Sequence, residues 1–175
     1  MVNEDANKVS EDPRETERIE RIWHRLESIP DPELPFLNVV ELGMVPRVFM
    51  ESGVPVVEVM PTYTGCPATD VILQDVRNLL AKIEPLGEVR LVLTPPWTTD
   101  FLTEAAKEKM RSHGIAPPES GQADRAFLLG KNRQVACPRC RSLETTLVSA
   151  FGSTACKAHY RCNACQEPFD HFKCI

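Results

Sequence analysis

The chain has 175 residues, of which 42% are hydrophobic and 26% are charged, a composition that suits one ordinary domain with or without a small added module. This apolar content excludes a chain that is disordered throughout. No apolar run reaches the roughly 18 residues of a membrane helix, and the polar, charged N-terminus does not resemble a secretory signal. We therefore expect a cytoplasmic protein.

Charge and cysteine are both unevenly distributed along the chain. Residues 1–130 hold 13 Lys/Arg and 22 Asp/Glu, a net charge of −9, whereas residues 131–175 hold 7 and 3, a net charge of +4. Six of the seven cysteines also lie in the last 39 residues. This break predicts two units that join near residue 131. A tail of +4 is too weakly basic to indicate nucleic-acid binding by itself, and it can equally balance metal-bound thiolates.

The first helix is predicted after a polar segment, residues 1–13, that we expect to be disordered. From Glu15 onward apolar residues recur at spacings of three and four, which indicates one buried helix face. Pro30 and Pro32 end this pattern. The residues that form the face are Ile19, Ile22, Trp23, Leu26 and Ile29.

Strands and helices alternate after this helix. Residues 54–60 and 88–93 are rich in β-branched side chains and predict strands. Residues 71–80 and 101–112 predict helices. The alternation indicates a small α/β or α+β domain over residues 14–118.

The remainder of the chain is predicted to be a linker and a small module. Residues 119–131 are polar and follow Pro117 and Pro118, which is typical of a linker. Residues 132–175 contain short strand-like pieces, at 145–151 and 158–161, but too little apolar mass for an independent core. A unit of this size usually needs disulfides or a metal.

Two Cys-x-x-Cys pairs in this module predict a structural zinc site. Two residues between thiolates let both sulfurs of a tight turn reach one ion, and two such turns complete a tetrahedron. Disulfides are disfavoured in a cytosolic protein, while a redox dithiol and an iron–sulfur cluster remain alternatives. The four expected zinc ligands are Cys137, Cys140, Cys162 and Cys165.

A second Cys-His set interleaves with the first. Cys156-x-x-His159 and His171-x-x-Cys174 have the spacing of another tetrahedral site. The alternative is that both cysteines are buried small residues and both histidines lie at the surface. Spacing alone favours this alternative.

Cys66 stands apart from the other cysteines, in the loop PTYTGCPATD that precedes the predicted helix 71–80. Pro67 suits the first helical position, so Cys66 is expected near the N-cap, where the helix dipole stabilises a thiolate. Gly65 allows the close approach of a ligand or partner. Cys66 is therefore a candidate iron or cluster ligand or nucleophile, and a buried capping cysteine is an equal alternative.

Asp31 and Glu33 place two carboxylates on one rigid turn, DPELP. They can ligate a metal or orient the Cys66 loop. A solvated turn that ends the first helix is the more common role of such a sequence.

Taken together, these segments resemble a known family. DPELP, NVVELGMV, PTYTGCPATD, LTPPWTTD and HGIAPP resemble, in this order, the SufT/PaaD-like domains associated with iron–sulfur assembly, over about residues 17–118. The tail segments CPRC, FGSTACKAHYRC and EPFDHFKCI resemble the phenylacetate-degradation (PaaD) branch of this family.

The resemblance implies an α+β domain, with helices on a small mixed or antiparallel sheet, followed by a zinc ribbon. It implies an accessory or maturation subunit of the phenylacetyl-CoA 1,2-epoxidase system, in which a di-iron oxygenase subunit and an iron–sulfur flavoprotein reductase carry the chemistry. The residues it marks as functional are Cys66, Asp31 and Glu33. It includes Cys156 and Cys174 in the family pattern but not His159 and His171 as ligands, which weakens the case for a second zinc.

Two main hypotheses follow. In the first, the protein is a maturation factor, and Cys66, with Asp31 or Glu33, transiently holds iron or an iron–sulfur cluster for the oxygenase or reductase subunit. In the second, the protein is a structural docking subunit, and Cys66 has no metal-transfer role. A nucleic-acid-binding zinc ribbon is a weaker third hypothesis, and a homodimer is plausible for a small domain.

Overall fold

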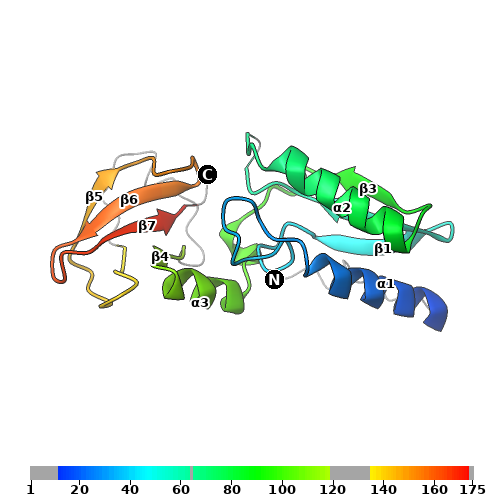
Figure 1. The fold of residues 1–175 in the computed structure, drawn as a ribbon, viewed down its shortest axis with the longest axis horizontal. Helices are drawn as coiled ribbons and strands as arrows, with labels where there is room; N and C mark the ends of the chain where they lie inside the picture. Colours follow the sequence, from blue (N-terminus) through cyan, green and yellow to red (C-terminus); the bar gives the residue numbers. More distant parts are fainter. Residues whose placement is uncertain (1–11, 64, 119–134, 174–175) are drawn as a thin grey trace. The chain divides into compact units, whose positions relative to one another are not determined.

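The computed structural model describes residues 12–63, 65–118 and 135–173. Contacts divide the chain into two compact units, one through Trp97 and one from Thr98. The mixed helix and sheet architecture that the sequence predicts is confirmed (Figure 1). No helix in the described part of the chain is long and apolar enough to cross a membrane. The predicted linker, residues 119–131, lies outside the described residues.

Helix α1 spans Pro13–Leu26 and begins earlier than predicted. Asp12 is its N-cap and accepts a hydrogen bond from the Arg14 N–H at 2.9 Å, while Pro13 occupies the first turn, where a missing N–H costs nothing. The segment expected to be disordered therefore ends before residue 12, and residues 1–11 lie outside the description. Ile19, Ile22 and Leu26 form the buried face, as the spacing predicts.

The sheet of the first unit has three strands in the order β1-β2-β3. β1 (Arg47–Glu51) and β2 (Val54–Val59) form an antiparallel hairpin, which turns at Ser52 and Gly53, both at positive φ. Helix α2 (Thr69–Ile83) then returns the chain to β3 (Glu88–Leu91), which is parallel to β2. α1 packs against β1, and α2 packs against β3.

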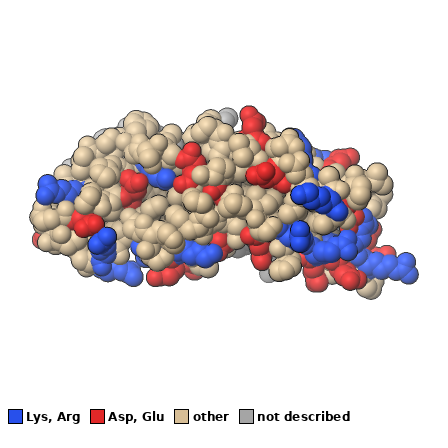
Figure 2. Space-filling model, in the orientation of Figure 1, with Lys and Arg blue, Asp and Glu red and all other residues tan. Residues whose placement is uncertain are grey.

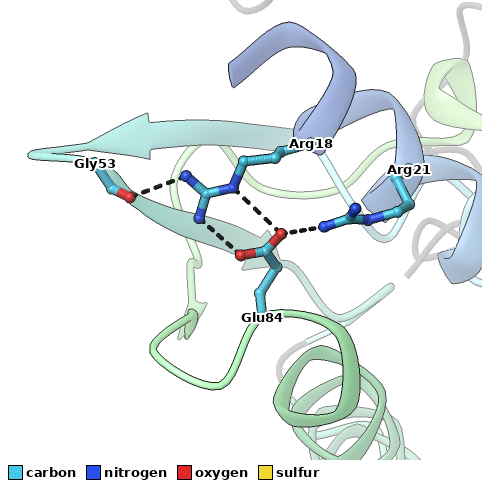
Figure 3. A network of polar contacts seen from close by, with 4 residues as sticks. All are labelled: Arg18, Arg21, Gly53 and Glu84. Atoms are coloured by element: carbon cyan, nitrogen blue, oxygen red, sulfur yellow. Dashed lines mark hydrogen bonds and ion pairs between the residues drawn. The ribbon is translucent and has the colours of Figure 1, made fainter. Parts of the chain in front are cut away.

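A partly buried ion-pair network joins three elements of this unit (Figure 3). The Glu84 carboxylate, 8% exposed, accepts hydrogen bonds from Arg18 and Arg21 on α1, and Arg18 also donates to the Gly53 carbonyl at 3.3 Å. The end of α2, one face of α1 and the β1–β2 turn are thereby held together. The hydrogen bond from the Arg18 guanidinium is the main cause of the lowered pKa of Glu84.

The second unit contains a four-stranded sheet in the order β4-β7-β6-β5. A 3₁₀ turn (η2, Thr99–Phe101) and α3 (Glu104–Ser112) lead into β4 (Ile115–Ala116). The other strands are β5 (Thr145–Ser149), β6 (Lys157–Cys162) and β7 (Pro168–Phe172).

The boundary between the units differs from the predicted one, which placed residues up to 118 in the first domain. Ile115 and Ala116 pair in parallel with Asp170 and His171 of β7, so β4 is part of the ribbon sheet. α3 packs against β4 and belongs to the same unit. Such a boundary depends on a pairing between residues far apart in sequence, which composition does not indicate.

Both signs of charge are spread over the visible face of the molecule, with acidic and basic side chains interspersed among neutral ones (Figure 2).

Candidate functional site

The two Cys-x-x-Cys turns of the ribbon have the same backbone design. In each turn the first cysteine donates its N–H to the carbonyl five residues later, from Cys137 to Ser142 at 3.0 Å and from Cys162 to Glu167 at 2.9 Å. The residue after the second cysteine is left-handed in both, with φ of 64° at Arg141 and 65° at Gln166. These matched turns present two sulfurs each toward a common centre.

The four sulfurs are close enough to hold one ion. Cys137 and Cys165 Sγ are 3.8 Å apart, Cys140 and Cys162 Sγ are 3.5 Å apart, and all four lie within 4.8 Å of one another. A tetrahedral zinc with bonds of about 2.3 Å places its sulfurs about 3.8 Å apart. The residues therefore fit a structural zinc, as the sequence predicts.

The pKa values of two cysteines in the tetrad are shifted in opposite directions. The Cys165 main-chain N–H donates to Cys162 Sγ at 3.5 Å and is the main cause that lowers the pKa of Cys162 to about 7. At Cys165 the main chain of Glu167 acts to lower the pKa, but desolvation and the neighbouring sulfurs outweigh it and raise the pKa to about 12. The raised pKa keeps the Cys165 thiol protonated near neutral pH, and a divalent ion that binds there replaces this proton.

The two histidines of the possible second metal set do not come together. In the β6–β7 pair His159 is opposite Asp170 and His171 is opposite Ala158, so the two imidazoles lie on opposite faces of the sheet. His159 Nδ1 lies 3.2 Å from Asp170 Oδ1, and His171 Nδ1 lies 3.1 Å from the Ala116 carbonyl. This interpretation of the four residues is therefore corrected: the two histidines cannot bind one ion.

Cys156 is buried, and the Thr154 hydroxyl lies 3.0 Å from its sulfur. Its main-chain carbonyl accepts the Lys173 N–H at 2.9 Å, which holds the start of β6 beside the end of β7. Cys174, the other cysteine of the predicted second site, lies outside the described residues. Cys156 thus has the partners of a packed thiol in its own strand pair.

Cys66 is the functional candidate of the first unit. Its N–H donates to the Tyr63 carbonyl and its own carbonyl accepts the Thr69 N–H, both at 3.2 Å, so the main chain of this loop is fixed on both sides of the thiol. The side chain is half-buried, and its sulfur has no hydrogen-bond partner among the described residues. The thiol is therefore held in place by its backbone and remains available.

Helix α2 begins two residues before the predicted range 71–80, and Cys66 lies two residues before its N-cap, near it as expected. Ala68 is the N-cap and provides no side-chain hydrogen bond to the first turn. The Thr69 hydroxyl oxygen is inaccessible and has no hydrogen-bond partner in the described part of the chain. The first turn of α2 thus presents N–H groups without a side-chain cap directly after the thiol. Thr69 was not predicted from the sequence, because a single threonine two residues after Pro67 is only a weak signal.

The carboxylates of the DPELP turn have different surroundings. Asp31 is buried, and its Oδ1 accepts the N–H groups of Glu33 at 2.9 Å and Leu34 at 2.8 Å, so it shapes the turn. Glu33 is half-buried. Within the described residues, the ribbon tetrad is the one group of three or more His, Cys, Asp or Glu that can hold a metal. Cys66, Asp31 and Glu33 are therefore not arranged as a ready-made three-ligand site.

Main-chain hydrogen bonds nevertheless connect the DPELP turn to the Cys66 loop. Val39 N–H donates to the Ile29 carbonyl, Met44 N–H to the Val39 carbonyl, and Met60 N–H to the Met44 carbonyl, at 3.1, 2.9 and 2.7 Å. Met60 immediately precedes the loop. The Trp97 indole N–H, a partner that the sequence did not indicate, donates to the Leu42 carbonyl at 2.9 Å in the same region.

Comparisons with known proteins match the two parts of the chain separately. Residues 19–92 match the family model of an iron–sulfur cluster assembly protein, and residues 121–173 match that of the PaaD zinc beta ribbon domain. A Bacillus anthracis crystal structure described as a domain of unknown function, DUF59, is 30% identical, covers 54% of this chain and 92% of its own, and superposes with a TM-score of 0.49.

Two curated relatives are informative. An Escherichia coli protein named as a "Putative 1,2-phenylacetyl-CoA epoxidase" subunit is 47% identical, over 90% of this chain and 94% of its own. A Bacillus subtilis protein named "Fe-S protein maturation auxiliary factor YitW" is 37% identical, over 50% of this chain and 88% of its own. The resemblance seen in the sequence is confirmed, and the chain belongs to the PaaD-like family, in which an iron–sulfur-assembly domain is joined to a zinc ribbon.

Proposed function

We propose that this protein assists the assembly of iron or an iron–sulfur cluster in a partner subunit of the phenylacetyl-CoA 1,2-epoxidase system. The partner is the oxygenase or the reductase, and the metal or cluster is cargo that the protein holds transiently. The names of the two relatives support the two halves of the proposal, the epoxidase system and the maturation role. Cys66 is the ligand that receives the cargo, and the protein is not catalytic alone.

The observation that carries the proposal is the state of the Cys66 thiol. The four ribbon sulfurs are committed to one another, whereas the Cys66 side chain is half-buried and its sulfur has no hydrogen-bond partner among the described residues. A thiolate binds iron strongly yet exchanges it through thiol chemistry, which suits a carrier. On binding, the thiol releases its proton to solvent.

The start of α2 supports an anionic cargo. A cluster ligated by thiolates carries negative charge, and the uncapped first turn of α2 follows Cys66 by two residues. N–H groups at a helix N-terminus stabilise anions. One cysteine fills only one coordination position of an iron ion, so the other ligands must come from Glu33, from added thiol or from the client protein. Such weak attachment to this chain favours release of the cargo to the client.

A docking subunit without metal transfer is the second candidate. The ribbon exposes Leu143, Val148 and Phe151, large apolar side chains of the kind that bind partners. In that case the ribbon makes the contact with the epoxidase and Cys66 is incidental. The two candidates predict opposite outcomes for a Cys66 substitution.

Anaerobic reconstitution with ferrous iron and sulfide tests the proposal. We expect visible absorption and bound iron in the wild type, and loss of both in Cys66→Ala, while Cys156→Ala, which removes a thiol outside the zinc tetrad, stays like the wild type. Zinc content, measured in the same samples, shows that the ribbon is intact. Iron is then followed into the apo reductase and apo oxygenase subunits. Equal iron binding and equal client activation by Cys66→Ala would overturn the proposal and favour the docking subunit.

A further inference from the structure

The free edges of the two sheets differ in how they are protected. β4 is two residues long, and the register of β5 is interrupted between Leu147 and Ser149, which disrupts the edge. β1 presents Arg47 and Glu51 and exposes no large apolar side chain. β3 is regular, ends at the exposed Leu91 and is followed by the exposed Leu93. In the described part of the chain it is therefore the edge with least protection.

The exposed leucines of β3 continue the core layer of the first unit. Leu91 is opposite Val59 in the register, and Val59 is fully buried, yet Leu91 is 46% exposed and Leu93 is 53% exposed. Both lie on the face that includes Val57, where the core residues gather. The apolar layer thus extends past the last strand without a cover.

The backbone of β3 is also open on this side. The Val92 N–H donates to the Val59 carbonyl at 2.9 Å, so the N–H and C=O groups of Leu91 point away from β2, toward the free edge. Alternation gives Val89 the same direction, and Leu93, just past the end of β3, can take it in a paired strand. A strand that pairs here receives hydrogen bonds and covers leucines at the same time.

We infer that the β3 edge binds a second copy of this chain, in antiparallel orientation, to form one continuous six-stranded sheet. The edge is self-complementary about Leu91. With Leu91 opposite itself, Val89 of each copy is opposite Leu93 of the other, and Arg90 is opposite Val92. No residue meets a like charge, and about six main-chain hydrogen bonds can form. A symmetric pair of this kind closes and does not grow into a fibre.

Neighbouring side chains agree with this register. Leu86, in the turn before β3, is 81% exposed, and Val71, in the first turns of α2, is 50% exposed. α2 runs antiparallel to β3 in the β2–α2–β3 crossover, so Val71 lies toward the Leu93 end and Leu86 toward the other. The two-fold axis carries Leu86 of the second copy toward Val71 of the first. Arg90 is held by Glu51 and Glu88, with 2.8 Å to Glu88, so its charge is already paired.

The pairing has a consequence for the two thiol loops. Cys66 precedes α2 and therefore lies toward the Leu93 end of each unit, and antiparallel pairing places these ends on opposite sides of the joined sheet. Each copy therefore contributes one Cys66 site to the dimer. This inference is independent of the proposed function, because it concerns association alone.

Charge substitutions at residue 91, followed by sedimentation equilibrium of the full chain, test the inference. The wild type is expected to be a dimer. Leu91→Lys and Leu91→Glu should each be monomeric, with association weakened at least about 100-fold, because like charges then meet across the axis. A mixture of the two variants should form a heterodimer. Val148→Lys, a matched change at an exposed valine of β5, should remain a dimer.

Each other outcome overturns the inference. A wild type that sediments as a monomer at about 100 μM, far above the range of a specific dimer, removes the interface. If Leu91→Lys by itself still forms dimers, the contact lies elsewhere on the protein. If the mixture of Leu91→Lys and Leu91→Glu stays monomeric, the pairing register about Leu91 is wrong. Far-UV circular dichroism and zinc content confirm that each variant is folded.

Discussion

The two units of this protein are stabilised in different ways. The first has a conventional core in which Ile22, Leu26, Val57 and Leu80 are almost fully buried between helices and sheet. The core of the second unit is smaller and includes two of its own metal ligands, Cys137 and Cys162, beside Tyr160 and Phe169. Two thiols of the ribbon are thus part of its core, whereas Cys66 of the first unit is half-buried and lies outside the buried core. The two units therefore differ in how much of their stability depends on thiols.

The strongest test of this comparison removes a zinc ligand. Cys137→Ser should abolish zinc binding and unfold the ribbon sheet, because a structural zinc contributes on the order of 10 kcal/mol to a module of this size. The first unit should stay folded. Trp23 and Trp97, the two tryptophans of the chain, both belong to the first unit, so their fluorescence reports on it, while zinc content reports on the ribbon.

Cys156→Ser is the control for this experiment, since it removes a buried thiol of the same unit outside the tetrad. It should retain one zinc per chain. Loss of zinc in this variant, or loss of the native tryptophan signal in Cys137→Ser, would show that the two units do not have separate sources of stability.

Truncation of a core side chain should have the reverse effect, because it should destabilise the first unit and leave the zinc of the ribbon in place. Ile22, on α1, is 0% exposed, and Ile22→Ala should lower the free energy of unfolding of this unit by about 2–5 kcal/mol, because it leaves a cavity in a packed core. Urea unfolding followed by tryptophan fluorescence measures the change. Glu20→Ala, at an exposed position of the same helix, should change it by less than about 0.5 kcal/mol. Zinc loss in parallel with the fluorescence transition would contradict independent units.

The Glu84 network is expected to make a smaller, pH-dependent contribution to the first unit. Glu84→Gln should cost about 1–3 kcal/mol at neutral pH, because it weakens charged hydrogen bonds to Arg18 and Arg21. The pKa of Glu84 is lowered in the folded protein, so its stabilisation is present above the ordinary glutamate pKa of 4.5 and is lost as the pH falls through the folded value. The measurement is urea unfolding from pH 7 down to pH 3. Wild type and Glu84→Gln should converge in stability at the acid end, and a constant difference would contradict the assigned role.

The sequence predicted the elements with strong periodicity and missed those that depend on pairing. α1, α2, β2 and β3 were expected within a few residues, because their apolar spacing is regular over a whole element. β1, β4 and β7 were not expected, since each is short and gains its structure from a neighbouring strand. The same cause moved the boundary between units, because β4 follows the first unit in sequence but pairs with the ribbon.

The candidate sites show the same limit. The zinc tetrad could be predicted because ligand spacing within a turn fixes sulfur positions locally. The second metal set failed because the pairing register, which spacing does not contain, decides that His159 and His171 lie on opposite faces. The role of Asp31 was ambiguous for a related reason. Its carboxylate is occupied by the N–H groups of its own turn, and this is visible only once the turn is built.

The smallest expected effect on stability is at Cys66, and this is where the comparison between the units is most informative. Its side chain is half-buried and its sulfur has no hydrogen-bond partner within the described residues, so Cys66→Ala should change the unfolding free energy of the first unit by less than about 0.5 kcal/mol. Zinc content should be unchanged. Iron uptake in anaerobic reconstitution should nevertheless be lost, because the thiol itself is the proposed ligand. A large loss of stability in Cys66→Ala would instead make this cysteine a packing residue like Cys156, and the separation between a structural and a chemical unit would no longer hold.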